Sequence, residues 1–290
     1  MKYYQIAKDG EVHLCLKTSD GALFDLSELE PSIKSFLDLL ILADDAHSSI
    51  DELASKVITG MHIERNIMEI SHVLKPINPP EVWAAGVTYK RSEQERRLES
   101  DTPDVYSKVY ASDRPELFFK GTARTVVGHG DEIGIRQDSS WNVPEPELAF
   151  VVSKGAIVGY TIGNDVSSRS IEGENPLYLP QAKFYDNSCA IGPCILSSEV
   201  ISDPHNLGIT MSVTRDEVTV FEGSTSTSQL VRSCEEISGW LHLHNHVPDG
   251  TVVLTGTGIV PPPEFSLLVG DICKITIDQI GVLQVGTKEV

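Results

Sequence analysis

Residues 141–169 read W-N-V-P-E-P-E-L-A-F-V-V-S-K-G-A-I-V-G-Y-T-I-G-N-D-V-S-S-R, and this stretch decides the fold. Two apolar runs, 148–152 and 156–162, flank Lys154-Gly155, a pattern typical of a β-hairpin. Pro146 cannot donate to a strand ladder, so the first strand begins there or lies at an edge or bulge. The stretch therefore predicts two paired strands with charged residues at one end.

The charged end of this hairpin carries three carboxylates. Glu145 and Glu147 are separated by one residue, so in a strand both side chains point to the same face. Asp165 follows the second strand. Like charges beside an apolar run must share a proton or a cation, and we expect a cation. The alternative is a solvated acidic strand end that holds no metal.

The register of the hairpin decides whether Asp165 can join the two glutamates. A two-residue turn at 154–155 would pair Glu147 with Ile162 and leave Asp165 on the opposite face. A three-residue turn at 153–155 would pair Glu147 with Thr161 and bring Asp165 to the glutamates' side. We expect the three-residue turn or an equivalent bulge.

The composition of the 290-residue chain limits the classes of function. Lys and Arg number 23 against 42 Asp and Glu, a formal net charge of −19, which repels nucleic acid and anionic membranes. No stretch approaches 18 consecutive apolar residues, and the first residues lack a signal-peptide pattern. The five cysteines are scattered and contain no C-x-x-C pair, which indicates reduced core residues. We expect a cytoplasmic protein with no nucleic-acid or membrane partner.

Two units are predicted along the chain. Residues 1–75 form a small N-terminal α+β domain, and the proline-rich segment 75–80 is a linker. Residues 80–290 form a β-dominated domain, which indicates a sandwich, barrel or rolled sheet. The expected N-terminal elements are strands over 3–6, 12–16 and 22–25, a helix over 31–42, and a helix capped by Ser48 or Ser49 that runs to 57.

Further polar residues of the second unit suit a site. The strand 114–120 would place Glu116, Phe118 and Lys120 on one face, where the alternative reading is a simple ion pair. The charged segment 88–100 suits a helix or a mobile lid. The turn T-G-T-G at 255–258 can bring backbone amides and a threonine hydroxyl close to a small anion.

Several motifs resemble the fumarylacetoacetate hydrolase superfamily over about residues 80–290. They are P-E-P-E-L-A (144–149), G-Y-T-I-G-N-D-V-S-S-R (159–169), K-F-Y-D (183–186), G-T-V-V-L-T-G-T-G (250–258) and G-D-x-x-x-I-x-I (270–277). The resemblance implies an α+β, β-dominated fold, a mixed β-sandwich roll that assembles as a homodimer or homotetramer. It also implies Mg²⁺, with Mn²⁺ or Ca²⁺ as substitutes, held by Glu145, Glu147 and Asp165.

Within the superfamily, R-P-E-L-F-F-K (114–120) and E-N-P-L-Y-L-P-Q-A-K (174–183) are most similar to 2-keto-3-deoxy-D-arabinonate dehydratases. That resemblance implies a small 2-keto acid substrate, a 2-keto-3-deoxy-pentonate that loses water to give 2,5-dioxopentanoate. Glu116 and Lys183 would then form the acid/base pair, and which of them is the base stays open. The implied substrate contacts are Thr257, Lys120, Arg169 and Tyr89.

One departure from the pattern of family hydrolases bears on the reaction. Those enzymes resemble one another in N-Y-x-x-H-x-x-E, whereas this chain has Ser92 at the histidine position and retains Glu95. A serine hydroxyl cannot take a proton from water at neutral pH, so dehydration is favoured over hydrolysis. The alternatives are a hydrolase or decarboxylase/isomerase of diketo or oxo-enoic acids, and a non-catalytic Ca²⁺-dependent carbohydrate-binding module.

Overall fold

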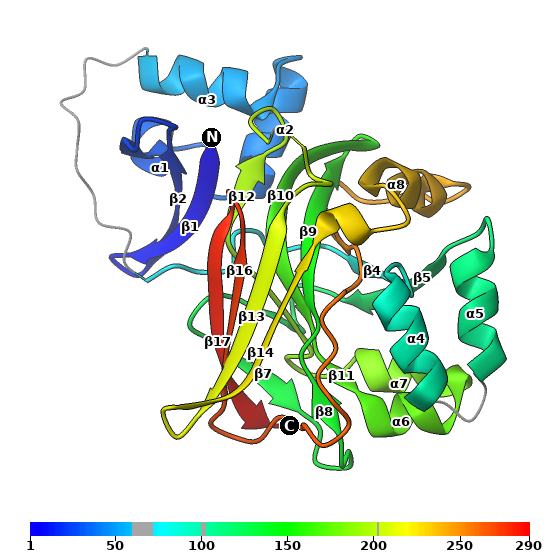
Figure 1. Ribbon diagram of the computed structural model, residues 1–290. Helices are drawn as coiled ribbons and strands as arrows, with labels where there is room; N and C mark the ends of the chain where they lie inside the picture. Colours follow the sequence, from blue (N-terminus) through cyan, green and yellow to red (C-terminus); the bar gives the residue numbers. More distant parts are fainter. Residues whose placement is uncertain (60–71, 100–102, 202) are drawn as a thin grey trace.

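Two β-sheets packed face to face make up the body of the protein (Figure 1). The computed structural model describes residues 1–59, 72–99, 103–201 and 203–290. The predicted β-dominated sandwich is confirmed. The large sheet has the order β3 (Leu23–Asp25), β2 (Glu11–Lys17), β1 (Lys2–Lys8), β12 (Cys189–Ser197), β10 (Ala156–Asp165), β9 (Pro146–Ser153), β15 (Thr251–Leu254), β4 (Val82–Gly86) and β5 (Glu116–Gly121), with β6 (Val126–Val127) beside β12.

The second sheet covers one face of the first. Its order is β14 (Val218–Ser226), β13 (Gly208–Arg215), β16 (Ile272–Ile277), β17 (Gly281–Glu289) and β7 (Glu132–Ile135). A short pair, β8 (Asn142–Val143) and β11 (Ser167–Ser168), lies apart from both. Phe150 and Ile162 of the large sheet share one buried cluster with Ile275 and Leu283 of the second sheet. This apolar layer holds the two sheets together.

Strand β9 reads as a continuous apolar run because both of its faces are buried. Phe150 points into the layer between the sheets, whereas Ala149 and Val151 join a second cluster with Phe36 and Leu39. These last two residues belong to α2 (Phe36–Asp45), which covers the other face of the large sheet. A strand covered on both faces has no need of the polar alternation of a surface strand.

The N-terminal unit continues the large sheet. Strand β1 pairs antiparallel with β12, so β1 to β3 extend the sheet at the edge opposite to β5. The helices here are α1 (Leu26–Leu29), α2 and α3 (Ile50–Thr59). The Ser35 hydroxyl accepts from the Asp38 amide, so α2 begins later than the predicted residue 31. Ser49 caps α3 by accepting from the Glu52 amide, as one of the two predicted capping residues.

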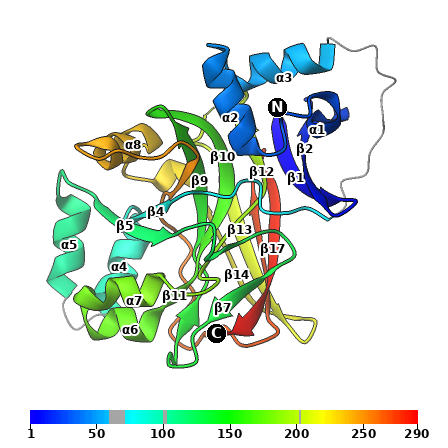
Figure 2. The same cartoon turned by 180° about the vertical axis from the view of Figure 1, so that it is seen from behind.

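The remaining helices lie beside β4 and β5, on the far side from α1 to α3 (Figure 2). The charged segment 88–100 forms a helix, α4, where the structure describes it. A later helix begins at Cys234, because the Ser233 hydroxyl accepts from the Glu236 amide and caps it there. These helices are α4 (Lys90–Glu99), α5 (Pro103–Ala111), α6 (Arg169–Glu174), α7 (Leu179–Lys183) and α8 (Cys234–His242), with single 3₁₀ turns at Pro176–Tyr178 and Thr227–Gln229.

The central hairpin differs from the predicted register but keeps the predicted face. The three-residue turn is wrong: Ser153 pairs with Ala156 across a two-residue turn in which Lys154 and Gly155 both have positive φ. A register shift between Ile157 and Gly159 then inserts one extra residue, the equivalent bulge that was the other expectation.

The bulge pairs Glu147 with Gly163 rather than with Thr161. The amide of Asp165 donates to the Glu145 carbonyl, with 3.0 Å between nitrogen and oxygen. An extra residue restores the parity of the side-chain alternation, so Asp165 lies on the same side as the two glutamates. That part of the prediction is confirmed.

All five cysteines are buried and free, as predicted. None of the described helices is both long enough and apolar enough to cross a membrane.

Candidate metal and active site

The strand directions bring residues that are distant in sequence to one end of the large sheet. Strand β9 starts where the antiparallel β10 ends, so Glu145 and Glu147 meet Asp165. Strand β15 is antiparallel to β9 and β4 is parallel to β15, so both end at the same place. The start of β5 pairs with the end of β4, where Glu116 faces Gly86. The site is therefore a product of the topology.

The three carboxylates predicted as metal ligands lie together. Glu145, Glu147 and Asp165 are each buried, and one oxygen of each lies within 4.8 Å of the others. Burial raises the pKa of the Glu147 carboxyl well above its usual range, and the charges of Asp165 and Glu145 raise it further. The Gly256 amide donates to Glu147 Oε2 at 2.5 Å. An oxygen-only set of acidic side chains fits a hard divalent cation such as Mg²⁺.

Lys183 is the cation that faces these carboxylates. It is the last residue of α7 and is only 2% exposed. Its Nζ donates to Glu145 Oε2 at 2.9 Å, to Asp165 Oδ2 at 3.0 Å and to the Ser167 hydroxyl at 2.6 Å. Buried charges persist when they are paired and hydrogen-bonded, and both conditions are met here.

A narrow pocket that is open to solvent lies over this cluster. Glu116 lies on its wall, and its carboxylate packs so closely on Gly86 that a Cβ there would sit 2.0 Å from Glu116 Oε2. Glycine at position 86 therefore makes room for the Glu116 carboxylate. The lining residues are Ala85, Gly86, Val87, Ser92, Glu116, Phe118, Glu145, Glu147, Asp165, Glu172, Leu179, Lys183, Gly256 and Thr257.

Of the four expected substrate contacts, only Thr257 lines the pocket. Lys120 is fully buried behind Asp165, and its Nζ lies 2.7 Å from Asp165 Oδ1. A register shift in the pairing of β4 with β5 leaves Lys120 without a Cα partner. Lys120 is therefore placed to hold a carboxylate in position.

Arg169 and Tyr89 also lie outside the lining of the pocket. Arg169 is buried, and its Nη2 lies 2.9 Å from Glu145 Oε1, so it too supports a carboxylate from behind. Tyr89 is 1% exposed, and its hydroxyl has no hydrogen-bond partner among the described residues. Neither side chain lines the pocket. The sequence alone does not reveal which residues are covered by neighbouring elements.

Glu172 is a pocket residue that the sequence analysis did not single out. It is 5% exposed, lines the pocket, and lies 3.9 Å from Arg169 Nη1. The available signal was the i,i+3 spacing of Arg169 and Glu172 on one helical turn, directly after the motif that contains Asp165. Ser92 also lines the pocket, whereas Glu95 of the same motif does not.

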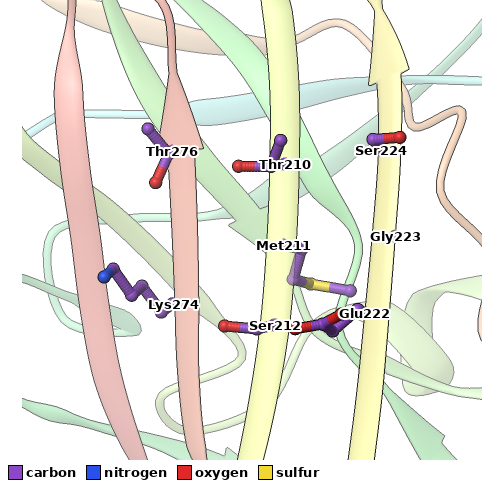
Figure 3. Close-up of a pocket in the computed structure, with 8 residues that line it drawn as sticks. All are labelled: Thr210, Met211, Ser212, Glu222, Gly223, Ser224, Lys274 and Thr276. Carbon is purple, nitrogen blue, oxygen red and sulfur yellow. The ribbon is translucent and has the colours of Figure 1, made fainter. Parts of the chain in front are cut away.

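A different hollow lies on the five-stranded sheet, away from these carboxylates. Figure 3 shows its hydroxyl groups from Thr210, Ser212 and Thr276, with the Lys274 ammonium pointing away from Glu222. These residues come from β13, β14 and β16, at the outer surface of the second sheet. Among the residues that line this hollow only Glu222 is acidic, so the hollow offers no cluster of carboxylates for a cation.

Comparison with known proteins agrees with this geometry. The chain is 48% identical over 283 residues to a probable 2-keto-3-deoxyxylonate dehydratase of Haloferax volcanii, covering 98% of both chains. It is 47% identical over 253 residues to the 2-dehydro-3-deoxy-D-arabinonate dehydratase of Saccharolobus solfataricus, covering 84% of this chain and 85% of the other.

A solved structure is similar over the whole length. It is a 2-keto-3-deoxy-D-arabinonate dehydratase complexed with magnesium and 2,5-dioxopentanoate, with a TM-score of 0.82 and 36% identity, covering 100% of this chain and 99% of that one. The profile of the fumarylacetoacetate (FAA) hydrolase C-terminal family matches residues 81–286. The chain therefore belongs to the fumarylacetoacetate hydrolase family.

Proposed function

We propose that this protein is a Mg²⁺-dependent dehydratase that converts 2-keto-3-deoxy-D-arabinonate into 2,5-dioxopentanoate and water. The observation that carries the proposal is that the Glu116 carboxylate and the Lys183 ammonium line the same pocket as three carboxylates suited to Mg²⁺. A β-elimination needs these parts: a base, an acid, and a cation that stabilises negative charge beside a keto group. The dehydratase names of relatives at 47–48% identity support it.

The carboxylates Glu145, Glu147 and Asp165 would hold the metal. A divalent cation held there would supply positive charge that stabilises the negative charge developing beside the keto group when a C3 proton leaves. Glu116 takes that proton, because it enters as a carboxylate on the pocket wall. Lys183 gives a proton to the departing C4 hydroxyl, because its side chain carries an ammonium and lines the same pocket. A further shift of the double bond and of a C5 hydrogen yields the aldehyde.

The 2-keto-3-deoxy acid keeps only one stereocentre of the pentonate from which it is formed. Once C2 is a ketone and C3 carries no hydroxyl, only C4 remains a stereocentre, so D-arabinonate and D-xylonate give the same 2-keto-3-deoxy acid. The different sugar names of the two relatives are therefore compatible with one reaction. Thr257 in the pocket is our candidate contact for the substrate carboxylate.

The same pocket argues against carbon–carbon hydrolysis. Ser92 lines it where the related hydrolases carry a histidine, and a serine hydroxyl is too weak a base to activate water at neutral pH. We therefore expect no efficient release of pyruvate from acylpyruvates.

The test is to incubate the Mg²⁺-loaded protein with 2-keto-3-deoxy-D-pentonate and with acylpyruvates and to identify the products by mass spectrometry. Formation of 2,5-dioxopentanoate from the first alone is the expected result. Efficient cleavage of an acylpyruvate would replace the dehydratase with a hydrolase.

We also propose that the protein acts in the cytoplasm as a homodimer or homotetramer. The small polar substrate and the family membership support this, and sedimentation of the purified protein tests the assembly.

A further inference from the structure

Two buried lysines contact the same carboxylate, one at each of its oxygens. Lys120 Nζ lies 2.7 Å from Asp165 Oδ1, and Lys183 Nζ lies 3.0 Å from Asp165 Oδ2. Both are almost fully covered, and both are point charges at the ends of flexible stems. Their surroundings differ, and this difference decides what each lysine can do.

Lys183 lies where a cation would be bound. Its Nζ bridges Glu145 and Asp165, two of the three carboxylates whose oxygens gather within 4.8 Å. The Lys183 side chain also lines the pocket, so the ammonium borders the space in which a substrate would lie. A divalent cation and an ammonium repel each other strongly at such short range in a buried site.

Lys120 has no such freedom. It is 0% exposed, does not line the pocket, and donates to two backbone carbonyls, those of Val166 at 2.9 Å and of Lys183. It therefore fixes one oxygen of Asp165 and the end of the helix that carries Lys183. Groups that orient a metal ligand in this way support the affinity of the site.

We infer that Lys183 is an internal counterion that competes with the metal, and that Lys120 is a positioning residue that favours it. In this account the Lys183 ammonium leaves Glu145 and Asp165 when a divalent cation binds and turns into the pocket, where it faces the substrate. Lys120 stays on Asp165 throughout. This inference rests on the proposed function, because it requires Glu145, Glu147 and Asp165 to be the metal ligands.

The two lysines thus give opposite predictions for metal affinity. Lys183→Met removes the competitor, and we expect it to tighten Mg²⁺ or Mn²⁺ binding on the order of tenfold or more, the size of a substantial coupling between two sites. Lys120→Met removes the support of Asp165, and we expect it to weaken binding by about 10- to 100-fold. If charge alone mattered, both substitutions would tighten binding.

The experiment is isothermal titration of MgCl₂ and of MnCl₂ into metal-stripped protein without substrate, for the wild type and both variants. Lys183→Gln, which keeps a neutral hydrogen-bonding side chain, is the second variant in case Lys183→Met does not fold. Circular dichroism establishes that each variant is folded.

Tighter binding after loss of the Lys183 charge, together with weaker binding in Lys120→Met, supports the inference. Equal or weaker binding in the folded Lys183 variants overturns it, and so does comparable tightening in Lys120→Met, while the metal site itself stands in both cases. Failure of the wild type to bind either metal would instead remove the proposed function, and the inference with it.

Discussion

Glu147→Gln should stabilise the metal-free protein and abolish its response to Mg²⁺. Glu147 is buried beside two other carboxylates, and its pKa is raised by burial and by those charges. Glutamine keeps the shape and can still accept from the Gly256 amide, which lies 2.5 Å from Glu147 Oε2. The substitution therefore removes a repelled charge without opening a cavity, but it also removes a metal ligand.

The magnitude follows from the separation of the carboxylates. At 4.8 Å and an effective dielectric constant of about 20, each like-charge pair costs about 3.5 kcal/mol. Glu147 has two such neighbours, and attraction to Lys183 offsets roughly one of them. Proton uptake by Glu147 limits the remainder, so we expect a gain of up to about 3 kcal/mol. At roughly 2–4 °C per kcal/mol, the melting temperature should rise by several degrees.

The pH dependence of the melting temperature tests whether the ionised Glu147 carboxylate destabilises the metal-free protein. A carboxyl whose folded-state pKa is raised contributes stability that is complete below its unfolded pKa of about 4.3 and is lost as pH rises through the folded value. Wild type and Glu147→Gln should therefore unfold at similar temperatures near pH 4 and diverge as the pH rises. Glu132→Gln, an exposed site, is the matched control and should behave as the wild type.

The assay is thermal unfolding in EDTA and in saturating MgCl₂, followed by circular dichroism. Wild type should gain stability with Mg²⁺, whereas Glu147→Gln should not, and its dehydratase activity should be absent. A Mg²⁺-induced shift in Glu147→Gln as large as that of the wild type would refute the assignment of Glu147 as a ligand.

Three further changes test the acid/base pair and its setting. Glu116→Gln should lose dehydration and also lose exchange of the C3 hydrogen in D₂O, followed by NMR; retained exchange would show that another group is the base. Lys183→Met should keep that exchange while product formation falls by about 10²–10⁴, and equal loss of both would contradict its role as the acid. Gly86→Ala, whose Cβ would meet the Glu116 carboxylate at 2.0 Å, should lower kcat with little change in melting temperature, and an unchanged kcat would argue against a catalytic Glu116.

The sandwich could be predicted because its strands carry strong local signals. The turn at Lys154-Gly155 and the apolar runs beside it located the central hairpin. The periodic apolar residues located α2 to within about five residues, and a serine cap located the start of α3. The extra residue between Ile157 and Gly159 carries no comparable signal. A bulge is set by what neighbouring strands require, and here Gly159 allows close approach of Ile195 on β12.

The sequence predicts a separate N-terminal unit, whereas in the structure the strands of this unit belong to the same large sheet as the rest of the chain. Residues 1–75 read as a small domain because their elements are short and a proline-rich segment follows them. In the structure Lys2 and Tyr3 pair with Leu196 and Ile195, so the strands of this unit extend the large sheet. Pairing of strand edges depends on the whole topology, which local composition does not encode.

The charged residues around the pocket could be named from the sequence. Whether each of them lines the pocket or lies covered beside it could not. Lys120 and Lys183 are both lysines beside Asp165, but Lys120 is fully covered, whereas Lys183 at the end of α7 lines the pocket. The same holds for Arg169, which lies behind Glu145. The sequence gives the charge of each side chain directly. Whether that side chain can reach a substrate depends on which atoms cover it in the folded protein. A family motif therefore identifies the members of a charged network, and the structure is needed to divide that network into groups that meet the substrate and groups that hold those in place.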